Sequence, residues 1–198
     1  MMPSTVSMKY LSRNKRILPL VGTMLGLAYP FCVNAAWRSG PVVLLGLIGV
    51  TIGLRWFCGR FSEPMNSFTL PSLVAGLLTM IIALVDAERG PLFYPAFMSS
   101  AFAMAFGWSL LQKQSLIERL AVPFEPSPTD PVRLYMRRVT CIWCLFLCLN
   151  TVASLYTIFA ADIDLWTFYN GFLAYVLMGM LFIAEYTIRQ RVRAGHGA

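Results

Sequence analysis

Three cysteines share one face of a single apolar segment, because Cys141, Cys144 and Cys148 recur at i, i+3 and i+7. Clustered thiols could carry out redox chemistry or bind a soft metal ion. No second cysteine pair or nearby histidine completes a zinc site, since the only histidine of the chain is His196. We therefore interpret the three cysteines as small residues buried in helix packing, and we expect neither a metal site nor a cofactor.

Catalytic motifs are absent from the sequence as well. The chain has no phosphate-binding glycine loop and no HExxH motif. His196 lies in a glycine-rich stretch and has no partners for a catalytic triad nearby. We expect that the protein is not an enzyme, and a membrane acyltransferase in particular would lack its usual histidine.

Two further sets of polar residues could form sites. Asn150, Asn170 and Glu185 fall inside long apolar segments, where polar side chains either bond helices together or line a pathway for a substrate. We favour the helix-bonding role and keep the polar pathway as the alternative. Four acids in short turns could converge on a cation, although exposed carboxylates need no ligand and Asp164 suits a cap for the helix expected from Leu165. These acids are Asp86, Glu88, Asp162 and Asp164.

The elements that must position these residues are six apolar segments. Hydrophobic residues make up 58% of the chain and charged residues 13%, and the mean hydropathy is +0.65, which excludes an ordinary soluble domain. Because a membrane-spanning helix needs about 20 residues, we predict an all-α polytopic membrane bundle of six transmembrane helices in one domain. The predicted helices span 17–37, 42–57, 68–85, 92–111, 139–161 and 165–186, with tails at 1–16 and 187–198 and a loop at 112–138.

Basic residues predict the orientation of these helices. Of the 16 lysines and arginines, 14 fall in the two tails, the loop 112–138 and the second gap, counting Arg55 at the adjoining end of the predicted helix 42–57. The other gaps hold only Arg38 and Arg89. Loops rich in Lys and Arg stay in the cytoplasm, so both termini are predicted to be cytoplasmic. The net charge of +7 then divides into +9 inside and −2 outside. This division needs no nucleic acid to explain it, and it favours anionic membrane lipids as partners.

The loop 112–138 is the only long connection between the predicted helices. It opens with a short amphipathic turn at 115–120 and continues with four prolines that are expected to prevent regular structure. We interpret the loop as a stiff spacer; the alternative is a docking site for a cytoplasmic partner or an anionic lipid. The prolines are Pro123, Pro126, Pro128 and Pro131, and the candidate docking residues are Arg119, Arg133, Arg137 and Arg138.

Three smaller features concern how the helices sit and pack. The first segment has a basic leader like a signal peptide, but it is long enough to span, so we expect it to be retained and keep cleavage as the alternative. Two GxxxG pairs favour close packing within the chain, with a homo-oligomer as the alternative. All tryptophans lie near predicted helix ends, where indole rings favour the headgroup region. The glycines are Gly22, Gly26, Gly49 and Gly53, and the tryptophans are Trp37, Trp56, Trp108, Trp143 and Trp166.

Several short motifs follow one another along the chain. They are Leu18-Pro19-Leu20, Leu116-Ile117-Glu118-Arg119, Trp143 with Phe146, and Trp166 with Tyr169 and Gly171. In this order they resemble the septation protein A family of bacterial inner-membrane proteins, although Asn170 replaces a lysine of that family and Ser154 lies near its expected asparagine. The stretches Arg137-Arg138-Val139-Thr140 and Glu185-Tyr186, with Arg189, are similar to related membrane proteins of aryl-polyene and xanthomonadin-type pigment clusters.

The resemblance implies a Gram-negative inner-membrane protein of the cell envelope, with envelope or pigment biosynthesis proteins as its partners. Together with the missing catalytic groups, it leads us to expect a non-catalytic protein of cell-envelope biogenesis. Such a protein would handle a lipid-like molecule or scaffold the machinery that makes or exports it. The alternative is a small secondary transporter whose pathway passes Asn150, Asn170 and the four acids of the outer turns.

Overall fold

The computed structural model describes residues 28–37, 43, 46, 49–50, 53, 66–121, 128–160 and 162–195. These residues form helices and turns without a strand, so the all-helical prediction is confirmed for them. After a helical stretch at 28–36, the elements are α3 (Asn66–Val85), the 3₁₀ turn η3 (Gly90–Phe93), α4 (Tyr94–Leu110), α5 (Leu116–Ala121), α6 (Asp130–Phe159), α7 (Ile163–Phe168), the π-helical turn η4 (Tyr169–Leu173) and α8 (Ala174–Gly195).

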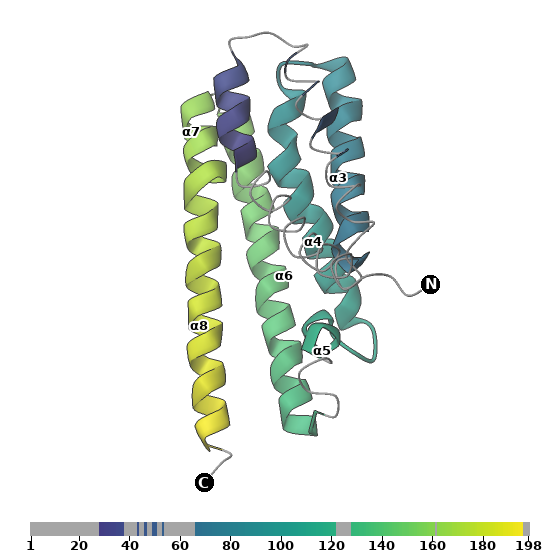
Figure 1. Cartoon of the computed structure of the whole chain (residues 1–198), viewed down its shortest axis with the longest axis vertical. Helices are drawn as coiled ribbons and strands as arrows, with labels where there is room; N and C mark the ends of the chain where they lie inside the picture. Colours follow the sequence, from purple (N-terminus) through teal and green to yellow (C-terminus); the bar gives the residue numbers. More distant parts are fainter. Residues whose placement is uncertain are drawn as a thin grey trace, which may run out of the picture.

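Four long helices lie side by side and alternate in direction (Figure 1). α3 and α6 run one way, while α4 and the continuous helix made of α7, η4 and α8 run the other way. α4 packs against both α3 and α6. The short α5 packs against α6 and α4, and it lies near the start of α6 (Figure 1).

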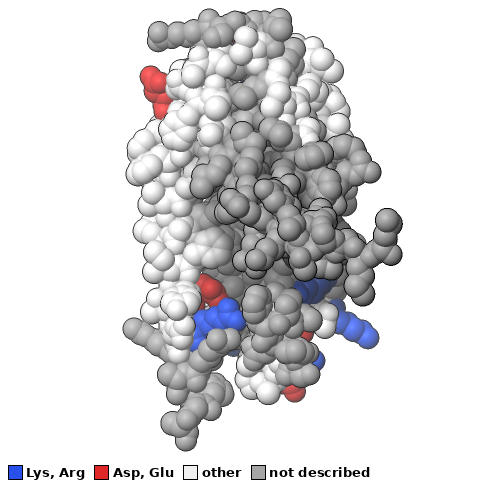
Figure 2. Space-filling model, in the orientation of Figure 1, with Lys and Arg blue, Asp and Glu red and all other residues white. Residues whose placement is uncertain are grey.

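The two ends of the bundle differ in charge. We call the end with the turns after α3 and α6 the acidic end, and the end with α5 and the start of α6 the basic end. Among the described residues drawn in Figure 2, those between the two ends are uncharged, and lysine and arginine side chains lie towards the basic end. The acidic end holds Asp86, Glu88, Asp162 and Asp164, and the basic end holds Lys113, Arg119, Arg133, Arg137, Arg138 and Arg189.

The helices at the basic end extend further than the apolar pattern predicts. α6 begins at Asp130 rather than at Val139, because Pro131 lies in the first turn, where a missing N–H costs no hydrogen bond. The prediction that this proline prevents regular structure is therefore wrong. α8 likewise continues to Gly195 instead of ending at Tyr186. With 30 residues, α6 is about 45 Å long, more than the roughly 30 Å of a bilayer's hydrocarbon core.

Buried side chains form two core clusters, one towards each end. Trp166 is fully buried near the acidic end, where its Nε1 donates a 3.1 Å hydrogen bond to the carbonyl of Leu92. Trp143 is buried near the basic end against the rings of Phe106 and Phe182. Both indoles therefore pack on neighbouring helices, and their level relative to the headgroup region stays a prediction. Trp108, by contrast, is exposed.

Two described helices are long and apolar enough to cross a membrane: Asp130–Phe159 and Ile163–Gln190. Within the chain, only 33% and 6% of their most apolar stretches are buried, whereas the core helix of a soluble protein is mostly buried. A shorter apolar helix, Leu70–Val85, lies within α3. The first two predicted segments, 17–37 and 42–57, fall largely outside the described residues.

Candidate functional site

Six polar side chains meet where α4, α6 and η4 come together, nearer the acidic end. We call this cluster the amide junction. Its two amides are almost completely buried, at 7% exposure for Asn150 and 3% for Asn170, so each needs hydrogen-bond partners from the protein itself. The members of the amide junction are Ser99, Asn150, Ser154, Thr157, Tyr169 and Asn170.

Asn150 joins three elements. Its Nδ2 donates a 2.8 Å hydrogen bond to Oγ of Ser99 on α4. Its Oδ1 accepts a 3.0 Å bond from the hydroxyl of Tyr169 on η4. The amide thus connects α4 to the last helix through α6, which is the role we expected for a polar side chain inside an apolar helix.

Asn170 fastens η4 to α6 and to its own helix. Its Oδ1 accepts a 2.7 Å bond from Ser154 Oγ, and its Nδ2 donates to Thr157 Oγ1 at 3.3 Å and to the carbonyl of Trp166 at 3.0 Å. Two consecutive side chains of the π-helical turn both reach α6. On a regular helix neighbouring residues point about 100° apart, whereas here both Tyr169 and Asn170 bond to residues of α6.

Glu185 lies apart from the two amides with which it was grouped as a possible pathway. It accepts a 3.4 Å hydrogen bond from the hydroxyl of Tyr135, near the start of α6. Fifteen residues separate it from Asn170 along one helix, a rise of about 22 Å. The structure therefore brings Asn150 and Asn170 to one junction and places Glu185 near the basic end.

The four acids of the acidic end do not form a metal site. Oδ1 of Asp86 accepts bonds from the backbone N–H groups of Glu88 and Arg89, at 3.2 and 2.9 Å. Oδ1 of Asp162 caps α7 by accepting from the N–H groups of Asp164 and Leu165, so the cap is Asp162 and not Asp164. Among the described residues, no three His, Cys, Asp or Glu side chains are placed to hold a metal ion. The cation site that we considered is therefore not assembled, because two of its acids satisfy their own turns.

The cysteines of α6 differ from one another in burial. Cys144 is half-buried, and its Sγ donates to the carbonyl of Ala103 at 3.5 Å. Cys141 and Cys148 are exposed on the surface of the chain. The expectation that all three are buried is therefore wrong for two of them, because the face that they share only partly turns towards α4.

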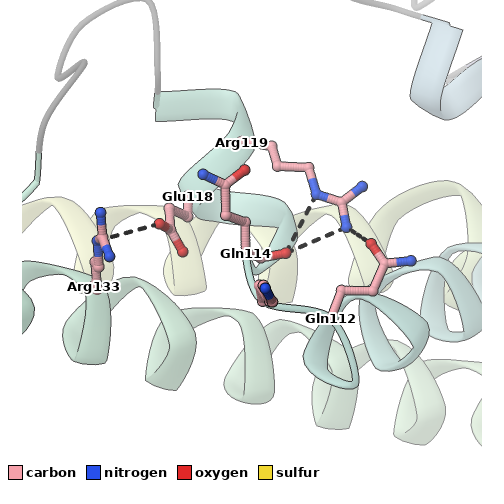
Figure 3. Close-up of a pocket in the computed structure, with 6 residues that line it drawn as sticks. Gln112, Gln114, Glu118, Arg119 and Arg133 are labelled. Carbon is pink, nitrogen blue, oxygen red and sulfur yellow. Dashed lines mark hydrogen bonds and ion pairs between the residues drawn. The ribbon is translucent and has the colours of Figure 1, made fainter.

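The basic end contains an open hollow of about 490 Å³ between the turn after α4, α5 and the start of α6 (Figure 3). We call it the basic hollow. The shape of the basic hollow depends on α5. Ser115 caps the start of this helix, because its Oγ accepts a 3.4 Å hydrogen bond from the backbone N–H of Glu118. Ser109 Oγ accepts from the N–H of Leu116 at 3.0 Å and ties this turn to α4. The lining residues are Gln112, Lys113, Gln114, Glu118, Arg119 and Arg133.

Two arginines are held in fixed positions around the basic hollow (Figure 3). Arg119 donates from Nε and Nη2 to the carbonyl of Gln114, both at 3.3 Å, and from Nη2 to Oε1 of Gln112. Arg133 Nε lies 3.6 Å from Oε1 of Glu118, whose side chain is only 6% exposed. The buried carboxylate and the half-exposed guanidinium neutralise each other where α5 meets α6.

The four predicted docking arginines therefore have different surroundings. Arg119 and Arg133 line the basic hollow. Arg137 closes the end of α4 by donating to the carbonyls of Leu110 and Gln112. Arg138 is exposed and is not among the residues that line the hollow.

Sequence reasoning missed most of the residues that complete both clusters. Ser99, Ser154 and Thr157 are ordinary small polar residues within apolar helices, and no local signal distinguishes them. At the basic hollow, the amphipathic turn predicted at 115–120 corresponds to α5, and the spacing of Ser115 and Glu118 is a helix-start signal that agrees with it.

Comparison with known proteins adds no assignment, because no protein-family model, curated protein or solved structure matches this chain. The resemblance to the septation protein A family stays a prediction.

Proposed function

We propose that this chain is a six-span protein of the bacterial inner membrane with both termini in the cytoplasm. In this proposal it takes part in cell-envelope biogenesis without catalysing a reaction. It handles a lipid-like molecule, or it scaffolds the proteins that make or export one. The resemblance to the septation protein A family supports the cellular setting.

Stripes of exposed apolar side chains along the helices are the main observation that supports a membrane location. One stripe runs along α6 at alternating spacings of three and four residues, and its members are between 51% and 73% exposed. Such a continuous apolar surface is unfavourable in water, so another apolar phase must cover it. The stripe consists of Ile142, Leu145, Leu149, Val152, Tyr156 and Phe159.

Similar stripes on other helices favour lipid as the covering phase. α3 exposes Leu77, Ile81 and Leu84, and the helix that follows η4 exposes Met180 and Ile183, all at more than half of their surface. α3 and α8 lie on opposite sides of the bundle (Figure 1). A single partner protein covers one face, whereas a bilayer surrounds all of them, so lipid accounts for the stripes more simply.

The amide junction supports the lipid-handling role over the transporter. Both amides of the junction are engaged by hydrogen bonds that join helices, and a transported polar substrate would have to displace those bonds. The open polar space is at the basic end instead, where a headgroup can enter from the membrane surface.

Cysteine labelling tests the membrane arrangement. In a cysteine-free background, Glu88→Cys should react with a membrane-impermeant maleimide in intact spheroplasts, and Lys113→Cys should react only after the membrane is disrupted. Leu145→Cys, in the apolar stripe of α6, is the matched control and should stay unlabelled without detergent. Labelling of Lys113→Cys in intact cells would reverse the orientation, and labelling of Leu145→Cys would contradict the membrane location.

Mass spectrometry of the protein in lipid nanodiscs tests the role. A stoichiometric lipid-like molecule supports handling, and a stoichiometric protein partner with only bulk lipid supports the scaffold. Turnover of an acyl or lipid-linked substrate by the purified protein would overturn the non-catalytic assignment. If a folded Asn150→Leu, Asn170→Leu variant lost uptake of a solute into vesicles, the transporter would replace the proposal.

A further inference from the structure

We propose that the basic hollow binds the phosphate group of an anionic amphiphile, with Arg119, Arg133 and Lys113 as its cationic contacts. The inference rests on the proposed function in one respect, since it takes the basic end to lie at the inner membrane surface. It adds a defined site and a ligand class, which the sequence pattern of basic loops does not supply.

The guanidinium groups of Arg119 and Arg133 have hydrogen-bond donors to spare. Arg119 uses Nε and Nη2 within its own turn, and Arg133 uses Nε for Glu118. Nη1 of Arg119 and both terminal nitrogens of Arg133 bond to no residue in the described part of the chain. A guanidinium that is already held by one edge loses less conformational entropy when its other nitrogens bind a ligand. Both arginines are therefore preorganised to bind an anion.

The charge and the donor types of the lining also suit a phosphate group. Three cations and one acid line the hollow, giving a net charge of +2, and the acid, Glu118, is already paired with Arg133. Gln112 and Gln114 add amide groups to the lining. Arginine forks with a nearby lysine are the residue types that recognise the several oxygens of a phosphate group.

Exposed apolar side chains beside the hollow indicate what is attached to the phosphate group. The turn that carries Gln112 and Lys113 directly follows Leu111, which is 79% exposed, and Trp108 lies one helical turn earlier and is 66% exposed. Exposed apolar residues next to a cationic hollow suit a molecule whose head is anionic and whose tail is apolar. A free phosphate ion would use only the hollow.

Lipid-binding measurements on the full chain test the site. The probe is phosphatidylglycerol titrated into the protein in phosphatidylcholine nanodiscs, with bound copies counted by native mass spectrometry. Lys113→Gln with Arg119→Gln should weaken binding about 10-fold or more, because the two side chains would lose charge-assisted hydrogen bonds to the bound phosphate group. Arg138→Gln is the matched control, since it removes one positive charge from the same end without altering the lining, and it should weaken binding about 2-fold or less.

The single change Lys113→Gln keeps the test decisive if the double variant unfolds, because no hydrogen bond or ion pair within the described chain depends on this exposed lysine. Equal losses for Lys113→Gln and Arg138→Gln would overturn the site, since binding would then depend on charge alone. Competition by millimolar inorganic phosphate separates the two sources of the ligand. Full displacement keeps the phosphate site and assigns it a soluble ligand, whereas no displacement supports the amphiphile.

Failure of this inference can be told apart from failure of the proposed function. The binding comparison depends only on the hollow, and the cysteine labelling depends only on the membrane arrangement. A correctly labelled protein with no preference for phosphatidylglycerol loses the site but keeps the six-span proposal.

Discussion

In the amide junction, both amide side chains bond to other parts of the chain, and the cluster lies between helices almost without exposure. In the basic hollow, two guanidinium groups are held at one edge and have terminal nitrogens left over, and the cluster opens to the outside. The two regions contain comparable polar groups, so polarity alone does not distinguish structure from function. The number of donors that the fold leaves unused does distinguish them.

The comparison predicts that changes near the amide junction lower stability and that changes at the basic hollow alter binding. The largest loss of stability is expected at the acidic end, where Gly90 lies close to α3. A Cβ added at Gly90 would lie 2.3 Å from the Cα of Ala83, so the backbone of α3 or η3 must move. We expect Gly90→Ala to lower the free energy of unfolding by about 3 kcal/mol.

Gly179→Ala is the matched control for this change, because nothing lies within 4 Å of a Cβ built there. It should leave stability unchanged or raise it by up to about 1 kcal/mol, since alanine is the better helix former. Denaturant unfolding of the detergent-solubilised protein measures both. Equal effects of the two substitutions would show that the close approach at Gly90 is not a constraint.

The next largest effect is expected within the amide junction itself. Asn170→Leu keeps the number of side-chain heavy atoms but removes three hydrogen bonds and leaves the carbonyl of Trp166 without its side-chain amide donor. We expect a loss of about 2 kcal/mol in the same unfolding measurement. Thr187→Val, which removes only an exposed hydroxyl bonded within its own helix, should change stability by less than about 0.5 kcal/mol.

A smaller loss of stability is expected beside the basic hollow, where an ion pair joins α5 to α6. Arg133→Ala leaves the buried carboxylate of Glu118 unpaired, but Arg133 is 53% exposed, so we expect about 1 kcal/mol. Adding Glu118→Gln to the same chain should restore part of this loss, because a neutral amide no longer needs the cation. A double-mutant cycle from thermal unfolding gives the coupling, and a coupling of zero would show that the ion pair contributes nothing.

The smallest effect on stability should come from Lys113→Gln, at about 0.5 kcal/mol or less, because the side chain is exposed. The same variant should nevertheless bind phosphatidylglycerol more weakly than the unaltered protein. Measuring unfolding and lipid binding on one preparation makes this the sharpest form of the comparison. A large loss of stability would mean that Lys113 belongs to the fold rather than to a binding site.

Much of the helical architecture was predictable from local patterns. The predicted helices at 68–85 and 92–111 correspond closely to α3 and to η3 with α4. The charged extensions of α6 and α8 were not predicted, since an apolar window detects only the part of a helix that can enter a membrane. Asn150 and Asn170 were recognised as important because amides are rare in apolar helices, but their partners were not identified.

By itself, the sequence determined that the chain is helical, that several helices are long and apolar, and that basic and acidic residues separate along it. These properties depend on composition and spacing within one segment. Only the tertiary structure decided that Tyr169 bonds to Asn150 while Asn170 bonds to Ser154, and that Arg119 and Arg133 line one hollow. A hydrogen bond requires two atoms within about 3 Å, so it depends on how each helix is rotated and shifted against its neighbour, and no local pattern specifies that relation.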